Sequence, residues 1–482
     1  MNTPSIFRDR ADDPNQAYSN SDSGSGFQPF SLGALAASLR SSNPIFNEPV
    51  TIDTTAVAIP PVAETVEETG LSPTLLEQLI LKILYYRGEL LGKDLALALG
   101  LKFSVIEPIV DALKWQHLLA VKRSMGMGSI SAVFVLSEAG RNAARDFLST
   151  NQYCGTAPVP LKQYEQIVKR QRMPKNWITS DTLRDVYKNL VVSPDIIAKI
   201  GPAVNSGKSF LIYGQPGNGK TALAECLGQI SSAPIFIPYA IECQGNIIQI
   251  YDPIYHHRIA EEESNVFMSA GPKYDERWFR SNRPFITSGG ELTLDMLDLS
   301  YNGSSKIYEA PFQMKANNGI YLIDDFGRQR ATPAEVLNRW IVPMERSIDF
   351  LSFRTGGKML IPFEAFLVFS TNLSPEQLGD EAFLRRIQYK MLVRSPDVAE
   401  FKEIFLRFCD GKELPVRENL VDYLIDHHYK PAGRPFRRCQ PRDILTHAID
   451  LINFEHRPWE LDEEVLHHSF TSCFTSEVGF ED

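Results

Sequence analysis

The sequence predicts an α/β protein built on a doubly wound parallel sheet, and three observations support this prediction. A short apolar run at residues 209–213 is followed by a glycine-rich loop and then by helical spacing of apolar residues. Two further apolar runs, within residues 319–329 and 363–373, end in the polar residues Asp324 and Asn372. Polar residues at the carboxyl ends of parallel strands are where such sheets form their ligand sites.

Residues 1–70 are rich in Ser, Asn, Pro and acidic residues, as in SNSDSGSG at 19–26. Such a composition buries too little apolar area to offset its ordering entropy, so this segment is expected to be mostly disordered. The stretch 29–40 is amphipathic, and it is interpreted either as a nascent helix or as a segment that folds against a partner.

Residues 71–150 show three helical patterns, two short strand patterns around a glycine-rich tip, and a closing helix. This order resembles a winged-helix domain. Its recognition helix would be Phe103–Gln116, which carries few basic residues, and its wing offers Lys122 and Arg123. The weak basic charge favours protein docking over DNA binding, and both readings stay open.

The rest of the chain divides by composition into three parts. Residues 151–176, with prolines and a basic run, are expected to form a linker. Residues 177–396 are expected to form a nucleotide-binding α/β domain. Residues 397–482 are expected to form a helical region, which acts as a lid, and a tail.

The glycine-rich loop fits the pattern G-x-x-x-x-G-K-[ST] between a strand and a helix, which is the context a phosphate-binding loop requires. Its backbone N–H groups would face phosphate oxygens, while Lys220 would reach the β- and γ-phosphates. The hydroxyl of Thr221 would ligate Mg²⁺. The nucleotide-binding residues are predicted to be Gly214, Gln215, Pro216, Gly217, Asn218, Gly219, Lys220, Thr221 and Ala222.

Downstream residues complete a nucleotide-hydrolysis site. Asp324 is expected to hold the metal, and Asp325 to polarise the attacking water. The amide of Asn372 would hold that water near the γ-phosphate. Arg385 and Arg386 lie together on a helix, and their planar guanidinium groups suit the charge that develops on a γ-phosphate.

The order of these elements resembles the AAA+ ATPases over about residues 180–455. On this resemblance the phosphate loop is Walker A, Asp324-Asp325 is Walker B, and Asn372 is sensor 1. The segment DEAFLRRI is similar to the family's arginine-finger segment, which implies that Arg386, with Arg385, reaches a neighbouring subunit. Arg442 matches the sensor 2 position, although Arg437 and Arg438 stay open as alternatives. A finger supplied in trans implies a ring, expected to be a hexamer.

Two predicted hairpins narrow the resemblance to the MoxR-like, chaperone-like clade, whose members remodel proteins. One turns at residues 355–358 and the other at the Asn-Gly pair 302–303. The family usually has Asp-Glu in Walker B, whereas this chain has Asp325 as the second acid. A carboxylate one methylene short would place the water less well, so hydrolysis is expected to be slow but real.

The sequence thus predicts an Mg²⁺-dependent ATPase ring that remodels an unknown protein client bound through the N-terminal domain. Two alternatives remain: an ATP-regulated protein that binds duplex DNA, and a nucleotide-gated scaffold with negligible turnover.

Composition limits the classes that remain. The net charge of −10 argues against general binding to polyanions. Six scattered cysteines without a C-x-x-C indicate a reducing compartment, and no apolar run is long enough to insert in a membrane, so the protein is expected to be soluble and cytoplasmic. The three adjacent His-His pairs, at 256–257, 427–428 and 467–468, are not expected to bind metal, since neighbouring residues cannot share one face.

Overall fold

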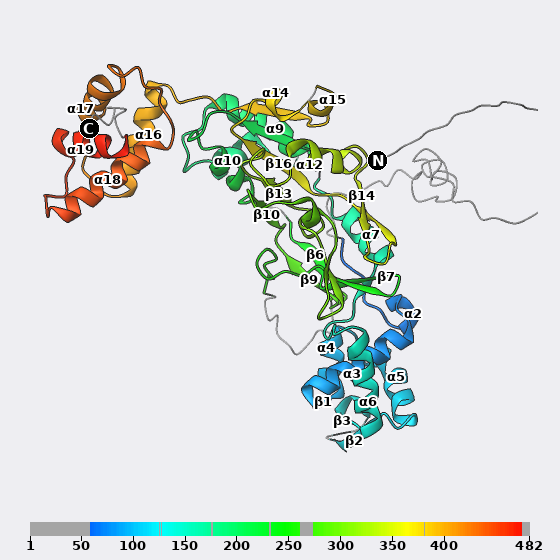
Figure 1. The fold of residues 1–482 in the computed structure, drawn as a ribbon. Helices are drawn as coiled ribbons and strands as arrows, with labels where there is room; N and C mark the ends of the chain where they lie inside the picture. The colour runs from blue at the N-terminus through cyan, green and yellow to red at the C-terminus, as the bar shows by residue number, and fades with distance from the viewer. Residues whose placement is uncertain are drawn as a thin grey trace, which may run out of the picture. The chain divides into compact units, whose positions relative to one another are not determined.

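The computed structural model (Figure 1) describes residues 58–474, except for 125, 127, 175–176, 231–232, 261–272, 380 and the side chains of 382 and 383. Most of the segment 1–70, including the stretch 29–40, and the end of the predicted tail therefore lie outside the described residues. Residues 58–70 differ from the expected disorder. Helix α2 (Val66–Thr69) forms there, and Ala63 and Thr69 are buried.

Residues 71–150 form helices around a small antiparallel sheet in the order β1-β3-β2. The helices are α3 (Pro73–Arg87), α4 (Gly92–Leu99), α5 (Phe103–Trp115) and α6 (Glu138–Thr150). The strands are β1 (Glu89–Leu91), β2 (Leu119–Ser124) and β3 (Ala132–Leu136). Ser72 caps α3 and Pro73 occupies its first turn, which is the expected start of a helix. The expected helices and strands all form, and β1 is an additional short strand.

The predicted parallel sheet has five strands in the order β10-β13-β16-β5-β17, and every neighbouring pair is parallel. The strands are β5 (Phe210–Tyr213), β10 (Phe285–Ser288), β13 (Ile320–Ile323), β16 (Phe366–Thr371) and β17 (Tyr389–Leu392). The strands β13 and β16 are buried along their whole length, as expected for a sheet covered on both faces.

Alternate residues of these strands enter two separate cores. Leu322 packs with the core of helices α8, α9 and α10, and Tyr321 with the core that contains α12. The helices around the sheet are α8 (Ser180–Val186), α9 (Pro194–Ser206), α10 (Lys220–Leu227), α11 (Phe312–Lys315), α12 (Pro333–Arg339), α13 (Ile341–Arg346), α14 (Pro375–Leu378) and α15 (Glu381–Leu384). The chain is therefore a mixed α/β protein with a parallel sheet buried on both faces.

A second five-stranded sheet, in the order β11-β12-β8-β7-β4, was not expected. It shares one core with the hairpin β14-β15, the pair β6-β9 and helix α7 (Leu161–Arg170). Its strands and those of the two smaller pairs are β4 (Val159–Pro160), β6 (Ile235–Pro238), β7 (Ala240–Cys243), β8 (Asn246–Gln249), β9 (Trp278–Ser281), β11 (Ser300–Asn302), β12 (Ile307–Glu309), β14 (Ile348–Ser352) and β15 (Lys358–Pro362).

The stretch 151–176, expected as a linker, thus contains a strand and a helix. Tyr164, Ile167 and Val168 of α7 are buried in the second core, which holds the segment against the sheet. Both predicted hairpins form, as β14-β15 and β11-β12.

The C-terminal region is helical, with its own core of buried Leu, Ile, Phe and Tyr side chains. It contains α16 (Val398–Gly411), α17 (Glu418–Leu424), a π-helical turn (Ile425–Tyr429), α18 (Gln440–Phe454) and α19 (Glu463–Cys473) (Figure 1). Within the described part of the chain, no helix has the length and apolar character needed to cross a bilayer.

Candidate nucleotide site

The glycine-rich loop connects β5 to α10, and its last glycine is the N-cap of that helix. Gly217 and Gly219 have φ values of 76° and 80°, which side chains rarely adopt. A Cβ on Gly217 would also lie 2.7 Å from Sγ of Cys439. The loop therefore curls in a way that only glycine allows without strain, and the N-terminus of α10 faces its interior.

The sheet order brings the predicted polar residues to one edge. Strand β16 lies between β5 and β13, so Asn372 sits between the loop and the two aspartates. Nζ of Lys220 donates to Oδ1 of Asn372 at 2.7 Å, and Nδ2 of Asn372 donates to Oδ1 of Asp325 at 3.0 Å. The Thr221 hydroxyl donates to the Asp324 carboxylate, at 2.9 and 3.1 Å from its two oxygens. These five side chains form one contiguous arrangement at the carboxyl edge.

The oxygens of Thr221 and Asp324 suit Mg²⁺, which prefers a few hard oxygen ligands and completes its shell with water and phosphate. Among the described residues, no group of three or more His, Cys, Asp or Glu side chains could hold a metal alone. The donor set therefore fits a metal that is shared with a phosphate ligand.

Burial lowers the pKa of Lys220, and the nearby Asp325 and Asp324 oppose this effect. Lys220 is only 6% exposed, and it also donates to the carbonyl of Gln215 at 3.0 Å. Asp325 has φ of 48°, a left-handed conformation that Asp and Asn adopt more readily than other side chains. The backbone here thus favours the shorter acid that the sequence has in place of Glu.

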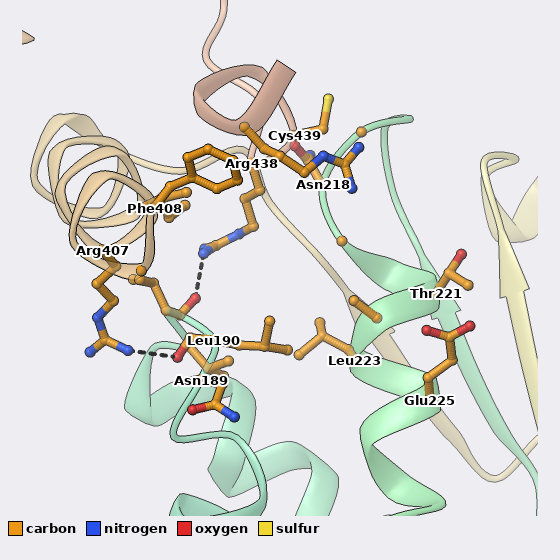
Figure 2. A pocket seen from close by; sticks show the side chains of 18 of the residues that line it. Asn189, Leu190, Asn218, Thr221, Leu223, Glu225, Arg407, Phe408, Arg438 and Cys439 are labelled. Atoms are coloured by element: carbon orange, nitrogen blue, oxygen red, sulfur yellow. Dashed lines mark hydrogen bonds between the residues drawn. The ribbon is translucent and has the colours of Figure 1, made fainter. Parts of the chain in front are cut away.

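A pocket of about 650 Å³ adjoins the loop. Figure 2 shows its wall of Leu190, Leu223 and Phe408, with Arg407 and Arg438 reaching the segment that contains Leu190. It is lined by Asn189, Leu190, Val191, Val192, Ile196, Gly217, Asn218, Gly219, Thr221, Ala222, Leu223, Glu225, Ile404, Arg407, Phe408, Gly411, Lys412, Arg438, Cys439 and Arg442. Apolar walls next to a phosphate loop suit a flat heterocyclic base.

Two arginines of the C-terminal region bind backbone carbonyls on the opposite wall. Arg407 Nη1 donates to the Lys188 carbonyl at 2.9 Å, and Arg438 Nη1 donates to the Val191 carbonyl at 2.6 Å. Arg438 also pairs with Glu400 at 2.7 Å. Sequence reasoning missed Arg407, since a backbone acceptor leaves no trace in the sequence.

The three sensor 2 candidates occupy different positions. Arg437 donates to the Ser395 hydroxyl at 2.6 Å, and its side chain lies 3.5 Å from the Cβ position of Gly217. The Cδ of Arg438 lies 3.9 Å from the position that a Cβ on Gly219 would occupy. Arg442 lines the pocket but is exposed and pairs with Asp443 at 3.0 Å. The structure thus places Arg437 and Arg438 next to the loop, in the segment before α18, and Arg442 in the first turn of α18.

The predicted finger arginines are not brought to the loop of their own chain. The Arg386 carbonyl accepts from the Ser209 hydroxyl at 3.1 Å, just before β5 begins, whereas the loop follows its end. Its guanidinium pairs with Glu345 at 2.8 Å. Arg385 is exposed and pairs with Glu381 at 2.9 Å.

In residues 71–150 the predicted basic residues are partly paired with acids. Lys122 contacts Glu89 at 2.5 Å, and Lys114 contacts Asp111 at 2.6 Å. Two of the adjacent histidine pairs, 427–428 and 467–468, contact each other through one ring of each pair. Nδ1 of His467 lies 3.4 Å from Nε2 of His428.

One of the comparisons with known proteins matches the C-terminal region to a family model. The family described as "Domain of unknown function (DUF8689)" matches residues 397–472, which hold the helices α16–α19. No curated protein matches the sequence.

Solved structures similar to the chain include NtrX from Brucella abortus, at 12% identity and TM-score 0.31, covering 65% of this chain and 57% of NtrX. The chain thus spans little more than half the length of NtrX. Two variants of RuvB from Thermotoga maritima match at 12% identity and TM-score 0.32, covering 62–63% of this chain and 73% of RuvB. TM-scores this low do not by themselves establish a common fold.

Proposed function

We propose that the chain is an AAA+-type ATPase, which binds ATP with Mg²⁺ at the phosphate loop and hydrolyses it. One observation carries this proposal: Lys220, Thr221, Asp324, Asp325 and Asn372 converge at the carboxyl edge of the parallel sheet. A lysine, a hydroxyl, paired carboxylates and an amide at a glycine-rich helix start form the set that phosphoryl transfer requires. Charged residues that only stabilise a fold pair with opposite charges, and they do not need a hydroxyl, an amide and a glycine-rich loop beside them.

Each residue has a role that follows from its place. The loop N–H groups and Lys220 bind phosphate oxygens, and Thr221 and Asp324 hold the metal. Bound Mg²⁺ neutralises charge on the phosphates. Asp325 accepts a hydrogen bond from water and orients it, and Asn372 holds the carboxylate of Asp325 in position. The base packs in the apolar pocket between Leu190 and Phe408.

The finer proposal is a MoxR-like, chaperone-like ring, expected to be a hexamer. Arg386, with Arg385, lies at the end of β5 opposite the loop, so it would act on the nucleotide of a neighbouring subunit. The N-terminal region would bind a protein client. Trp115, at the end of α5, is 88% exposed, which favours a protein partner. Lys114 of the expected recognition helix and Lys122 of the wing each pair with an acid, which weakens the case for duplex DNA.

The test is the ATPase rate per chain as a function of protein concentration, for the parent, Arg386→Ala and Arg385→Ala. An active ring predicts a rate that rises with concentration. It also predicts a loss of about 100-fold or more in Arg386→Ala. Arg385→Ala tests whether the second arginine contributes to the finger. Arg184→Ala, at an exposed arginine of α8 that pairs with Asp181, is the matched control for charge and should keep the parent's rate. A rate that is independent of concentration and unaffected by Arg386→Ala would refute the ring.

A further inference from the structure

A second pocket, of about 320 Å³, lies at the other end of the parallel sheet. Phe285 and Ile320, the first residues of β10 and β13, line it, together with Gly228 at the end of α10. The phosphate loop follows the carboxyl end of β5, so this pocket and the nucleotide site occupy opposite edges. Arg283 and Trp177 supply the pocket's strong hydrogen-bond donors.

Arg283 is a half-buried cation that forms no ion pair with any described residue. Its Nη1 donates to the backbone carbonyls of Gln171, at 2.9 Å, and Asn318, at 2.6 Å. Its Nε is buried and has no hydrogen-bond partner among the described residues. Both hydrogen bonds of the guanidinium come from Nη1, so Nη2 makes none to those residues. Burial alone lowers the pKa of Arg283 to about 10, with no carboxylate to oppose it.

The unpaired atoms Nε and Nη2 form one edge of the guanidinium, the edge that binds two oxygens of a carboxylate or phosphate side by side. Because two carbonyls hold Nη1, the plane of the group is fixed and this edge is pre-organised. A buried charged group that lacks partners destabilises the fold, so its free donors are normally completed by water, an ion or a ligand.

A third donor lies in the same pocket. The indole Nε1 of Trp177 is buried and has no hydrogen-bond partner among the described residues. Indole nitrogen donates and never accepts, so it also calls for an acceptor. The end of α10 does not supply one, because the carbonyls of Glu225, Cys226 and Leu227 already accept from the next three N–H groups of the chain.

We propose that this pocket is a binding site for a small oxyanion, a carboxylate or a phosphate, held by the Nε–Nη2 edge of Arg283 and the indole N–H of Trp177. Arg283 is the one charged side chain among the described residues that line the pocket, so the pocket favours an anion over a cation. The pocket volume suits a ligand of a few heavy atoms. This site is independent of the nucleotide site and of the function proposed above.

The experiment measures the melting temperature of the full chain against inorganic phosphate and against malonate. Every protein in this experiment, including the reference, carries Lys220→Ala, which weakens phosphate binding at the loop. A parallel titration with NaCl at matched ionic strength measures the effect of salt alone on the melting temperature. The site predicts a saturable rise in melting temperature, and the more effective anion identifies a phosphate or a carboxylate site. No saturable rise with either anion overturns the proposal.

Two variants locate the binding. Arg283→Lys keeps the charge but loses the two-pronged edge, so the apparent dissociation constant should rise about tenfold or more. Trp177→Phe keeps the ring and loses one donor, so a smaller rise of about threefold is expected. An unchanged dissociation constant in Arg283→Lys overturns the proposal. Where Arg283→Lys does not fold, an unchanged dissociation constant in Trp177→Phe overturns it.

Discussion

Nζ of Lys220 lies 2.7 Å from Oδ1 of Asn372, and the amide nitrogen of Asn372 lies 3.0 Å from Oδ1 of Asp325. One amide therefore joins the cation that binds phosphate to the acid that orients water. We expect Asn372→Ala to lower the ATPase rate by about 100-fold while ATP binding stays within a few-fold. Lys220→Ala should abolish ATP binding itself. Measuring the ATP dissociation constant beside kcat separates the two, and a normal kcat in Asn372→Ala would contradict the role of the amide.

Asp325 combines a left-handed backbone with a short carboxylate. Asn is isosteric and tolerates the same backbone, so Asp325→Asn should fold normally and bind ATP, with hydrolysis reduced by about 100-fold. If this variant hydrolyses ATP as fast as the parent, Asp325 does not position the water.

Asp325→Glu tests the backbone directly. It restores the longer acid, but Glu in a left-handed conformation costs about 1 kcal/mol, so its melting temperature should fall below that of Asp325→Asn. A turnover above the parent's would show that the shorter side chain of Asp325 limits the rate, which is the reason that the sequence predicts slow hydrolysis.

The predictable part of the chain is the part whose signal is local. The strand before Gly214, the strand that ends at Asp324 and the one that ends at Asn372 are short apolar runs, and each forms where the sequence indicates. Strand order was not predicted, because pairing depends on contacts far apart in the chain. Yet it is this order that places Asn372 between Lys220 and Asp325.

The second sheet shows more clearly which parts of the fold could not be predicted from the sequence. Its strands have two to four residues each and come from distant segments, so apart from the predicted hairpin β11-β12 none has a pattern long enough to mark it. Tyr164 illustrates the consequence, since it lies in a stretch expected as a linker but is buried and accepts a hydrogen bond from Asn317 at 2.8 Å. Arg407 was also not predicted as a pocket residue, because it binds the backbone carbonyl of Lys188 and a carbonyl is present at every position of the chain.

Arg438 lies just before α18 and Arg442 lies in its first turn, so the two arginines allow a matched comparison. Arg438 contacts the Val191 carbonyl and approaches the phosphate loop, whereas Arg442 is exposed and pairs with Asp443. We expect Arg438→Ala to weaken ATP binding about tenfold, because it removes both a cation near the loop and a link to the pocket wall. Arg442→Ala should change it less than about twofold. If nucleotide titrations show a larger loss of ATP affinity in Arg442→Ala than in Arg438→Ala, the sensor 2 role belongs to Arg442.

His256 should make the stability of the second sheet depend on pH. It is 1% exposed, its Nδ1 accepts from the Asp252 N–H at 3.1 Å, and its Nε2 lies 2.9 Å from the Lys315 carbonyl. These partners fit the neutral ring, because a proton on Nδ1 would face another N–H. Burial lowers the pKa of His256 below its usual 6.5, although the Lys315 carbonyl and Asp252 oppose the shift.

A lowered pKa means that the unfolded chain binds the proton first as the pH falls. The stability from neutral His256 is therefore present above about pH 6.5 and is lost as the pH falls from there to the lowered value. We expect the free energy of urea unfolding to fall as the pH is lowered from about 7 to about 5. His256→Gln should be less stable at neutral pH and show a flatter dependence over this range. The exposed neighbour is the control: His257→Gln should keep the parent's slope, and an equal flattening there would assign the effect elsewhere.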